Sequence, residues 1–316
     1  MKRILVTGAL GQIGTELVLK LRDIYGEGNV VASDIKRKDC PKIVESGPFE
    51  IVDVVQAHQI ADAAKKYDVD MIIHLAALLS AVGEANPAKA WKINMGGLFN
   101  TLEVARELKC SVFTPSSIGA FGNSTPKDNT PQDTIQRPDT MYGVTKVAGE
   151  LLCDYYFHKY GVDTKGVRFP GLISYETLPG GGTTDYAVHI YYGAVKDRRY
   201  TCYIKKGTYM DMMYMPDALN AVVTLCEADP SKLIHRNAFN ISAMSFAPEH
   251  IYNEIKKNIP EFEMDYDVDP VRQRIAESWP NSLDDSAARA EWGWKPHYDL
   301  TSMTKDMLKK LNEKLK

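Results

Sequence analysis

The sequence predicts an α/β protein built on a doubly wound parallel sheet, followed by a smaller C-terminal α/β domain. Short apolar runs alternate with helical patterns through the first half of the 316 residues, as expected for βαβ units. The run Met71-Ile-Ile-His-Leu75 is apolar almost throughout, which is typical of strands buried on both faces. The composition changes after Gly171, so we expect the main domain at 1–171 and the smaller one at 172–316.

The expected elements follow one another in the order that a parallel sheet requires. Strands are predicted at 4–6, 29–34, 49–53, 71–77, 111–117 and 163–169. Helices are predicted at 11–25, 55–67, 88–107 and 142–160. Two later segments, 218–225 and 237–241, have patterns that suit a return to the main sheet. The stretch from Pro260 to Pro280 has no clear period.

Bulk composition narrows the class of protein. The formal net charge is −3, from 38 basic and 41 acidic residues, so no basic excess indicates nucleic acid or an anionic membrane as a partner. Five scattered cysteines predict free thiols rather than a disulfide framework, and no metal site. No apolar run approaches the ~20 residues of a membrane span. We expect a cytoplasmic protein, and a transit peptide that has already been removed remains an alternative.

A glycine motif follows the first predicted strand. In Thr7-Gly8-Ala-Leu-Gly11-Gln12-Ile13-Gly14 the glycines recur every three residues and open the first helix. Such a turn lets the backbone approach a pyrophosphate, and the helix N-terminus supplies N–H donors. Strand, glycine turn and helix together predict a Rossmann-type dinucleotide-binding domain, with Gln12 and Ile13 beside the cofactor.

Asp34 ends the second predicted strand, about 20 residues after the glycine motif. In dinucleotide-binding domains an acid at this distance from the glycines binds the adenosine ribose. Its carboxylate would accept hydrogen bonds from both ribose hydroxyls and repel a 2′-phosphate, so NAD is favoured over NADP. Lys36 and Arg37 nearby weaken this preference, because cations accept a 2′-phosphate. Further residues expected along the cofactor are Ile35, Asp53 and Val54. The alternative for Asp53 is a surface cap.

Tyr142 and Lys146 stand in Tyr-Gly-Val-Thr-Lys, a spacing that places both on one helix face. A free phenol loses its proton only near pH 10, and an ammonium one turn away stabilises the phenolate. The pair suits a general base that removes an alcohol proton, although the same spacing also occurs on surface helices. The same ammonium can hold the nicotinamide ribose, so Tyr142 and Lys146 are also expected beside the cofactor. Ser116 and Ser117 end the strand predicted at 111–117, where open α/β sheets bind ligands. We expect Ser117 to orient the substrate oxygen and Ser116 to support it.

These motifs occur in the order and spacing of the extended short-chain dehydrogenases, a family that includes nucleotide-sugar epimerases and dehydratases. The closing segments 283–289 and 292–296 also resemble the C-terminal signature of that family. The resemblance implies that Leu75, Ala76, Ala77 and Asn94 lie near the cofactor. We expect His74 to be a core histidine with satisfied hydrogen bonds rather than a catalyst.

Three segments, 74–84, 179–186 and 277–280, resemble short-chain-type L-threonine 3-dehydrogenases. An amino-acid substrate needs a carboxylate for its ammonium group, and Asp185 could supply it. Candidates for holding the substrate carboxylate are Ser80, Thr183, Thr184 and the N–H groups of the 180–182 glycine turn. Trp279 is predicted either to close over the site or to pack in the core.

Met210 argues against a nucleotide-sugar substrate, because nucleotide-sugar relatives carry at that position an arginine that meets the diphosphate. The resemblance implies oxidation of L-threonine by NAD to 2-amino-3-oxobutyrate. It also implies a homodimer formed through the helices at 88–107 and 142–160. The alternatives are a nucleotide-sugar 4-epimerase and a non-catalytic NAD sensor on the same fold.

Overall fold

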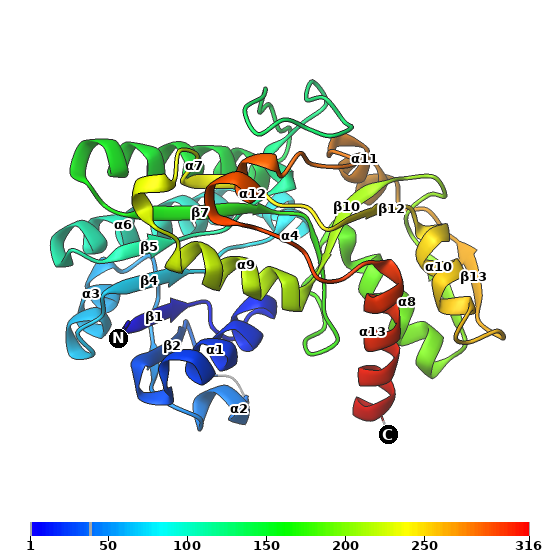
Figure 1. The fold of residues 1–316 in the computed structure, drawn as a ribbon, viewed down its shortest axis with the longest axis horizontal. Coiled ribbons are helices and arrows are strands. Elements are labelled where there is room, and N and C mark those ends of the chain that lie inside the picture. The colour runs from blue at the N-terminus through cyan, green and yellow to red at the C-terminus, as the bar shows by residue number, and fades with distance from the viewer. Residues whose placement is uncertain (1, 38–39, 316) are drawn as a thin grey trace.

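The computed structural model describes residues 2–37 and 40–315, and within them eight strands form a parallel sheet (Figure 1). Seven strands follow the order β11-β7-β5-β4-β1-β2-β3, and β6 pairs with β7. All of their pairings are parallel, which confirms the predicted α/β fold. The strands are β1 (Ile4–Thr7), β2 (Val30–Asp34), β3 (Phe49–Ile51), β4 (Met71–His74), β5 (Ser111–Phe113), β6 (Ser116–Ser117), β7 (Thr164–Phe169) and β11 (Asn237–Asn240).

Helices cover both faces of this sheet, so it is doubly wound. One apolar core joins the sheet to α1 (Gln12–Tyr25), α2 (Pro41–Val44), α9 (Met215–Glu227) and α12 (Ser286–Trp292). A second core joins the opposite face to α3 (Ala57–Lys66), α6 (Gly97–Leu108) and α7 (Met141–Tyr160). The buried residues Leu17, Val18 and Leu21 of α1 illustrate the helical spacing that such a face requires. Among the described helices none is long and apolar enough to cross a membrane.

The smaller part of the molecule has its own core, and Figure 1 shows it to the right of the main sheet. Its mixed sheet consists of β8 (Gly171–Ile173), β10 (Met210–Tyr214) and β12 (Met244–Phe246). Two further strands, β9 (Arg199–Cys202) and β13 (Glu263–Tyr266), pair in parallel. Its helices are α8 (Tyr186–Lys196), α10 (Pro248–Lys256), α11 (Pro270–Ser278) and α13 (Leu300–Lys314). Between these elements the chain returns to the main sheet as β11, so the domain boundary near residue 171 stays a prediction.

Two predicted elements are interrupted. The strand expected at 111–117 divides into β5 and β6 around Pro115, which has no N–H to donate to a ladder. The helix expected at 88–107 consists of α5 (Pro87–Trp91), a π-helical turn (Lys92–Gly96) and α6. Such turns occur often at functional sites, and this one contains Asn94. The remaining short helices are α4 (Ser80–Ala85) and the 3₁₀ turns Glu27–Asn29, Ile118–Ala120, Thr183–Asp185 and Pro230–Lys232.

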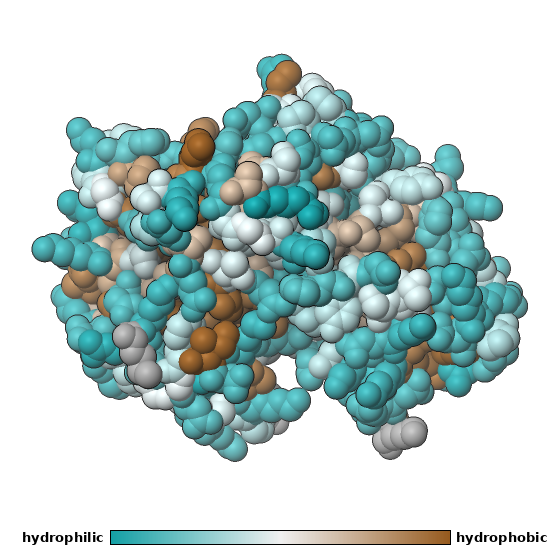
Figure 2. Space-filling model, viewed as in Figure 1, coloured by the Kyte–Doolittle hydropathy of each residue, from teal (hydrophilic) through white to brown (hydrophobic). Residues whose placement is uncertain are grey.

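A cleft separates α1 and α2 from α13, and Figure 2 shows the notch at the lower edge of the molecule. Glu16 of α1 lines this cleft and accepts a hydrogen bond from the Ser174 hydroxyl. Burial raises the pKa of Glu16 from 4.5 to about 7. Glu176 opposes ionisation further, whereas Lys314 and Lys42 favour it only weakly. Between about pH 4.5 and pH 7, Glu16 is therefore protonated in the folded protein and ionised in the unfolded chain.

We expect Glu16→Gln to stabilise the protein above neutral pH. Because the pKa is higher in the folded state, wild-type stability is fully present below about pH 4.5 and falls as the pH rises to about 7. Glutamine keeps the oxygen that accepts from Ser174 and carries no charge to desolvate. The gain in free energy of unfolding should be about 1–3 kcal/mol at pH 8 and only about a quarter of that at pH 5. Denaturant titrations at both pH values measure it, and an equal gain at pH 5 would contradict the ionisation argument.

Candidate active site

The glycine turn after β1 packs so closely against neighbouring backbone that Gly8 and Gly14 have no room for a side chain. Gly8 has a φ of +69°, and a Cβ there would lie 2.7 Å from the backbone N of Ala76. A Cβ on Gly14 would lie 2.4 Å from the carbonyl oxygen of Gly8, and one on Gly11 3.3 Å from the same atom. The turn thus lies against the 75–77 loop and brings its backbone close to whatever binds above it.

The start of α1 suits a dinucleotide pyrophosphate. Gly11 precedes the helix, and within the described residues no side chain caps it and no acid stands in the first turn. The first N–H groups are thus available to an anion. Gln12 and Ile13 line a pocket of about 150 Å³, and the buried Gln12 Nε2 finds no partner among the described residues. This unused donor fits a polar ligand such as NAD.

The carboxylate of Asp34 is fixed at the end of β2. Its Oδ2 accepts from the Leu10 N–H at 3.0 Å and its Oδ1 from the Ile35 N–H at 2.9 Å. Each oxygen keeps a lone pair for a ribose hydroxyl. The side chain of Ile35 is exposed beside it.

Asp53 caps a turn, because its Oδ1 accepts from the Val55 N–H at 3.1 Å. Val54 is buried, and its side chain occupies the space where Gly97 lacks a Cβ. The geometry favours the capping alternative for Asp53. Its contact with the adenine stays a prediction.

We expect Asp34→Ala to lower NAD affinity about tenfold, the lower end for hydrogen bonds to a charged group, because water reaches this partly exposed position. Discrimination against NADP should weaken at the same time, since the repulsion of the 2′-phosphate is lost. Fluorescence titration with both cofactors measures these effects. Asp23→Ala, on the exposed face of α1, is the matched control. A wild-type preference for NADP would show that Asp34 does not select the cofactor.

The loop after β4 and Asn94 form one unit. β4 ends at His74 rather than at Ala77, and residues 75–79 form an irregular loop, although the Leu75 N–H still donates to the Thr7 carbonyl of β1 at 3.0 Å. Asn94 binds both backbone groups of Leu78 and donates to the Thr145 hydroxyl at 3.1 Å. It therefore ties the loop that contains Leu75, Ala76 and Ala77 to α7.

The three predicted catalytic residues meet in one pocket. The Lys146 ammonium lies 5.4 Å from the centre of the Tyr142 ring and donates to the Pro115 carbonyl at 2.6 Å. A Cβ on Gly119 would lie 3.1 Å from the Tyr142 ring and 3.5 Å from Ser117 Oγ. Tyr142, Ser117 and Lys146 therefore line the same pocket, and two lysine N–H groups remain for other partners.

A buried ion pair fixes the strand end behind Ser117. The Ser116 hydroxyl donates to Glu150, whose Oε2 lies 2.8 Å from Arg168 Nη2. Both serines line the pocket, but the Ser116 hydroxyl is bound to Glu150, whereas the Ser117 oxygen accepts from the Gly119 N–H at 3.1 Å and keeps its proton for another partner. The role of Ser117 in orienting the substrate stays a prediction.

His74 is buried. Its Nδ1 lies 2.9 Å from the Thr7 hydroxyl and 3.2 Å from the Thr101 hydroxyl. Burial, with a smaller contribution from the nearby Lys146 charge, lowers the pKa of His74 to about 3. A neutral histidine bound to two threonines agrees with a structural role.

The predicted substrate residues line the other end of the same pocket: Ser80, Thr183, Thr184, Asp185 and Trp279. Asp185 is buried, and its Oδ2 accepts from the N–H groups of Gly181 and Gly182 at 2.9 and 2.6 Å. Burial raises the pKa of Asp185, and these two bonds oppose the rise. Asp185 therefore organises the glycine turn, and its second oxygen keeps lone pairs for a ligand. The two N–H groups, once candidates for a substrate carboxylate, are committed to Asp185.

Thr183 and Trp279 differ in what they offer a ligand. The Thr183 Oγ1 is buried and has no hydrogen-bond partner in the described chain. Trp279 packs with Ile118, Phe121, Ile275 and Leu283 and also borders the pocket. Thr183 is thus an available donor. Trp279 packs in an apolar cluster on the pocket wall, and its closure over the site stays a prediction.

Sequence reasoning missed part of this pocket. Leu79 and the segment 170–172 also line it. Thr145, which accepts from Asn94, lies inside the Tyr-x-x-x-Lys motif, and this position was the available signal. The sequence of segment 170–172 contains no signal of its role, because the pairing of β8 with β10 brings this segment to the site.

The chain is similar to known proteins over almost its whole length. The NAD dependent epimerase/dehydratase family matches residues 4–242. The chain is 66% identical to an L-threonine dehydrogenase of Clostridium difficile, with a TM-score of 0.98 over 99% of this chain and 98% of that one. It is 46% identical to the holo form of a GalE-like L-threonine dehydrogenase of Cupriavidus necator, with a TM-score of 0.95 over 98% and 99% of the chains. An uncharacterized epimerase/dehydratase of Staphylococcus haemolyticus is 60% identical over 99% of each chain. The chain belongs to the NAD dependent epimerase/dehydratase family, and its cofactor is NAD.

Proposed function

We propose that the protein oxidises the β-hydroxyl of L-threonine with NAD, giving 2-amino-3-oxobutyrate, NADH and a proton. The observation that carries this proposal is the single pocket that joins Tyr142, Lys146 and Ser117 to the Asp185 turn. A general base thus lies in the same enclosure as a buried carboxylate, the arrangement that a small zwitterion with a hydroxyl requires. The L-threonine dehydrogenases among its structural relatives support this choice of substrate.

In the proposed mechanism the glycine turn and Asp34 would hold NAD, which would supply the acceptor for the hydride of the β-carbon. Ser117 donates to the substrate oxygen and orients it. Tyr142 takes the hydroxyl proton, and the nearby Lys146 ammonium stabilises the negative charge of the phenolate. The carbonyl of Pro115 fixes the position of this ammonium.

At the opposite end, the free oxygen of Asp185 would accept from the substrate ammonium. The hydroxyls of Ser80 and Thr183 would donate to the substrate carboxylate. Thr183 is the stronger candidate, because its buried oxygen has no other partner in the described chain. Trp279 would exclude water from the apolar side of the substrate.

A nucleotide sugar is the less favoured substrate. Met210 is fully buried in the core of the smaller part, where it pairs with Phe246 across β10 and β12. A methionine in that position offers no charge to a diphosphate. The 4-epimerase alternative would therefore need another cation.

NADH formation tests the proposal directly. L-Threonine should reduce NAD rapidly, 3-hydroxybutyrate should react poorly because it lacks the ammonium group, and UDP-sugars should not react. Interconversion of UDP-sugars without net NADH, together with no reaction of L-threonine, would establish the epimerase alternative instead.

We also propose that the protein forms a homodimer through α6 and α7. Large apolar side chains stand exposed on these helices, including Phe99 of α6 and Val144, Leu151 and Tyr155 of α7. Exposed apolar surface of this kind marks association sites. Sedimentation should give twice the mass of the 35.3-kDa chain, and Leu151→Glu should give the single mass. A wild-type monomer would refute this assembly.

A further inference from the structure

The strand segment that contains Ser117 is short. β6 consists of Ser116 and Ser117 alone, and they pair with Arg168 and Phe169 of β7. Pro115, which precedes them, has no N–H to donate to a neighbouring strand. Few backbone hydrogen bonds are therefore available to fix this segment, so its side-chain contacts matter more than they do in a longer strand.

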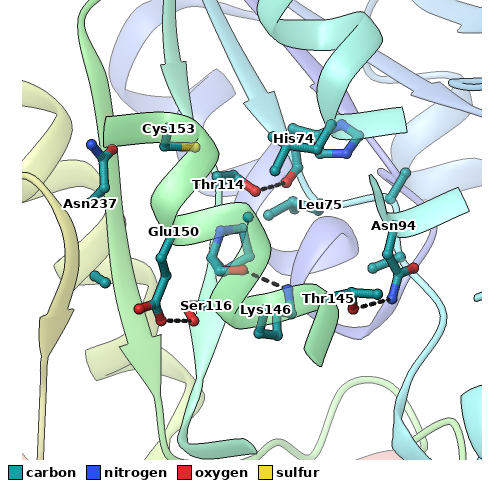
Figure 3. A pocket seen from close by; sticks show the side chains of 16 residues that line it. His74, Leu75, Asn94, Thr114, Ser116, Thr145, Lys146, Glu150, Cys153 and Asn237 are labelled. Atoms are coloured by element: carbon teal, nitrogen blue, oxygen red, sulfur yellow. Dashed lines mark hydrogen bonds between the residues drawn. The ribbon is translucent and has the colours of Figure 1, made fainter. Parts of the chain in front are cut away.

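Helix α7 holds the segment with side chains from successive turns. The Lys146 ammonium donates to the Pro115 carbonyl at 2.6 Å, and the Ser116 hydroxyl donates to Glu150. Figure 3 shows Glu150 directed from α7 toward Ser116. Lys146 and Glu150 are four residues apart, so both lie on the helix face that also contains Tyr142. The helix that supplies the base thus also holds the strand segment of the substrate-orienting serine.

The carboxylate of Glu150 has four hydrogen-bond donors around it. Its Oε1 accepts from the Ser116 hydroxyl and from Arg168 Nε, the latter at 3.1 Å. Its Oε2 accepts from Arg168 Nη2 and Gln136 Nε2, both at 2.8 Å. Glu150 and Arg168 are only 7% and 6% exposed, and charge-assisted hydrogen bonds are strong where water is excluded. The carboxylate is therefore fixed in one orientation.

Arg168 connects this carboxylate to other parts of the chain. Its Nη1 donates to the Gln132 carbonyl at 2.8 Å and to Asn240 Oδ1 at 3.1 Å. Its guanidinium carbon lies 5.0 Å from the centre of the Phe121 ring. Arg168 itself belongs to β7, the strand with which β6 pairs. The ion pair thus joins α7, β7, β11 and the loop before α7 into one block, and this block holds Ser116.

We propose that Glu150 and Arg168 are positioning residues for the substrate-orienting serine. By holding Ser116, they place the Ser117 hydroxyl at a fixed distance from the Tyr142 phenol. The inference rests on the proposed function, in which both hydroxyls act on the same substrate oxygen. A misplacement of about 1 Å between groups that act together can cost about 10²-fold in rate, so the position of this short segment should affect turnover.

A double-mutant cycle tests the proposal, with kcat for L-threonine as the readout. Ser116→Ala removes the hydroxyl that Glu150 holds and leaves the ion pair intact, so kcat should fall about tenfold. Ser117→Ala should lower kcat ~10²-fold, the usual cost of losing one donor to a reacting oxygen. If Ser116 acts through Ser117, Ser116→Ala should cause no further loss in a protein that already carries Ser117→Ala. Equal losses in both backgrounds would overturn the inference.

A second variant removes the ion pair instead of the serine hydroxyl. Glu150→Met combined with Arg168→Met replaces both charges by apolar side chains of similar length, a change that buried ion pairs often tolerate. The value of kcat should again fall about tenfold, and only while Ser117 is present. If this variant does not fold, the Ser116→Ala cycle alone decides.

Thr164→Val is the matched control, because the buried Thr164 hydroxyl also joins β7 to α7, by donating to the Cys153 carbonyl at 3.1 Å. It should keep kcat within about twofold of wild type. NAD affinity and thermal unfolding should change little in Ser116→Ala, which separates positioning from general damage. A wild-type kcat in Ser116→Ala, or a loss confined to NAD affinity, would contradict the proposal.

Crystal structures give a readout that needs no substrate. In wild type, Ser117 should have one side-chain conformation, with its oxygen accepting from the Gly119 N–H. In Ser116→Ala the Ser117 hydroxyl should be displaced, and an unmoved hydroxyl would overturn the inference whatever the substrate is. If wild type forms no NADH from L-threonine, the proposed function fails, and the crystals still decide whether Ser116 holds Ser117 in place.

Discussion

Replacing Tyr142 with phenylalanine should reduce kcat for L-threonine by ~10²–10⁴-fold, the usual contribution of a positioned acid or base. The ring lies almost entirely buried between Gly119 and Lys146, so phenylalanine fills the same space. The loss therefore reflects the missing oxygen rather than a cavity. NAD binding and the unfolding midpoint should change little, because the glycine turn and Asp34 are untouched.

Steady-state kinetics, fluorescence titration with NAD and thermal unfolding together measure this prediction. Tyr209→Phe is the control, since Tyr209 is an exposed tyrosine of the smaller part. Turnover within about twofold of wild type in Tyr142→Phe would mean that another group takes the proton. A collapse of NAD binding would instead assign Tyr142 to the cofactor site.

Asp185→Asn should lower kcat/KM for L-threonine about ten- to hundredfold, because a hydrogen bond to a charged group contributes about 1.5–3 kcal/mol. Asparagine keeps an oxygen for the N–H groups of Gly181 and Gly182, so the turn should retain its shape. What disappears is the charge opposite the substrate ammonium. Residual activity on 3-hydroxybutyrate, which has no ammonium, should fall much less.

Comparing the two substrates separates the two roles of Asp185. Proportional losses on both compounds would mean that Asp185 shapes the turn without contacting the amine. Asp197→Asn, with the same charge change at the exposed end of α8, should leave both activities unchanged.

The main sheet was predictable because local pattern and long-range structure agree there. Buried parallel strands are continuous apolar runs, and the glycine turn requires a strand before it and a helix after it. β13 and α11 could not be predicted in the same way. β13 is an exposed strand that exists through its pairing with β9, some sixty residues away, so its sequence carries no burial period.

The residues of the candidate site also differ in whether local sequence or long-range structure determines their position. Tyr142 and Lys146 were found because four-residue spacing on a helix fixes their relative position. Asp185 was predicted because a carboxylate can bind the ammonium group of an amino acid. Its hydrogen bonds to the glycine turn could not be predicted, because they depend on a loop conformation that no sequence pattern encodes. No sequence pattern indicated Arg168, because it reaches Glu150 only through the packing of β7 against α7.

The central claim is that hydride leaves the β-carbon of L-threonine while Tyr142 holds the hydroxyl proton. L-Threonine deuterated at the β-carbon tests it most directly, by mass spectrometry of the reduced cofactor. The account predicts one deuterium in each NADH formed by wild type and almost no reduced cofactor from Tyr142→Phe. NADH formed without deuterium, or no NADH from L-threonine at all, would contradict it.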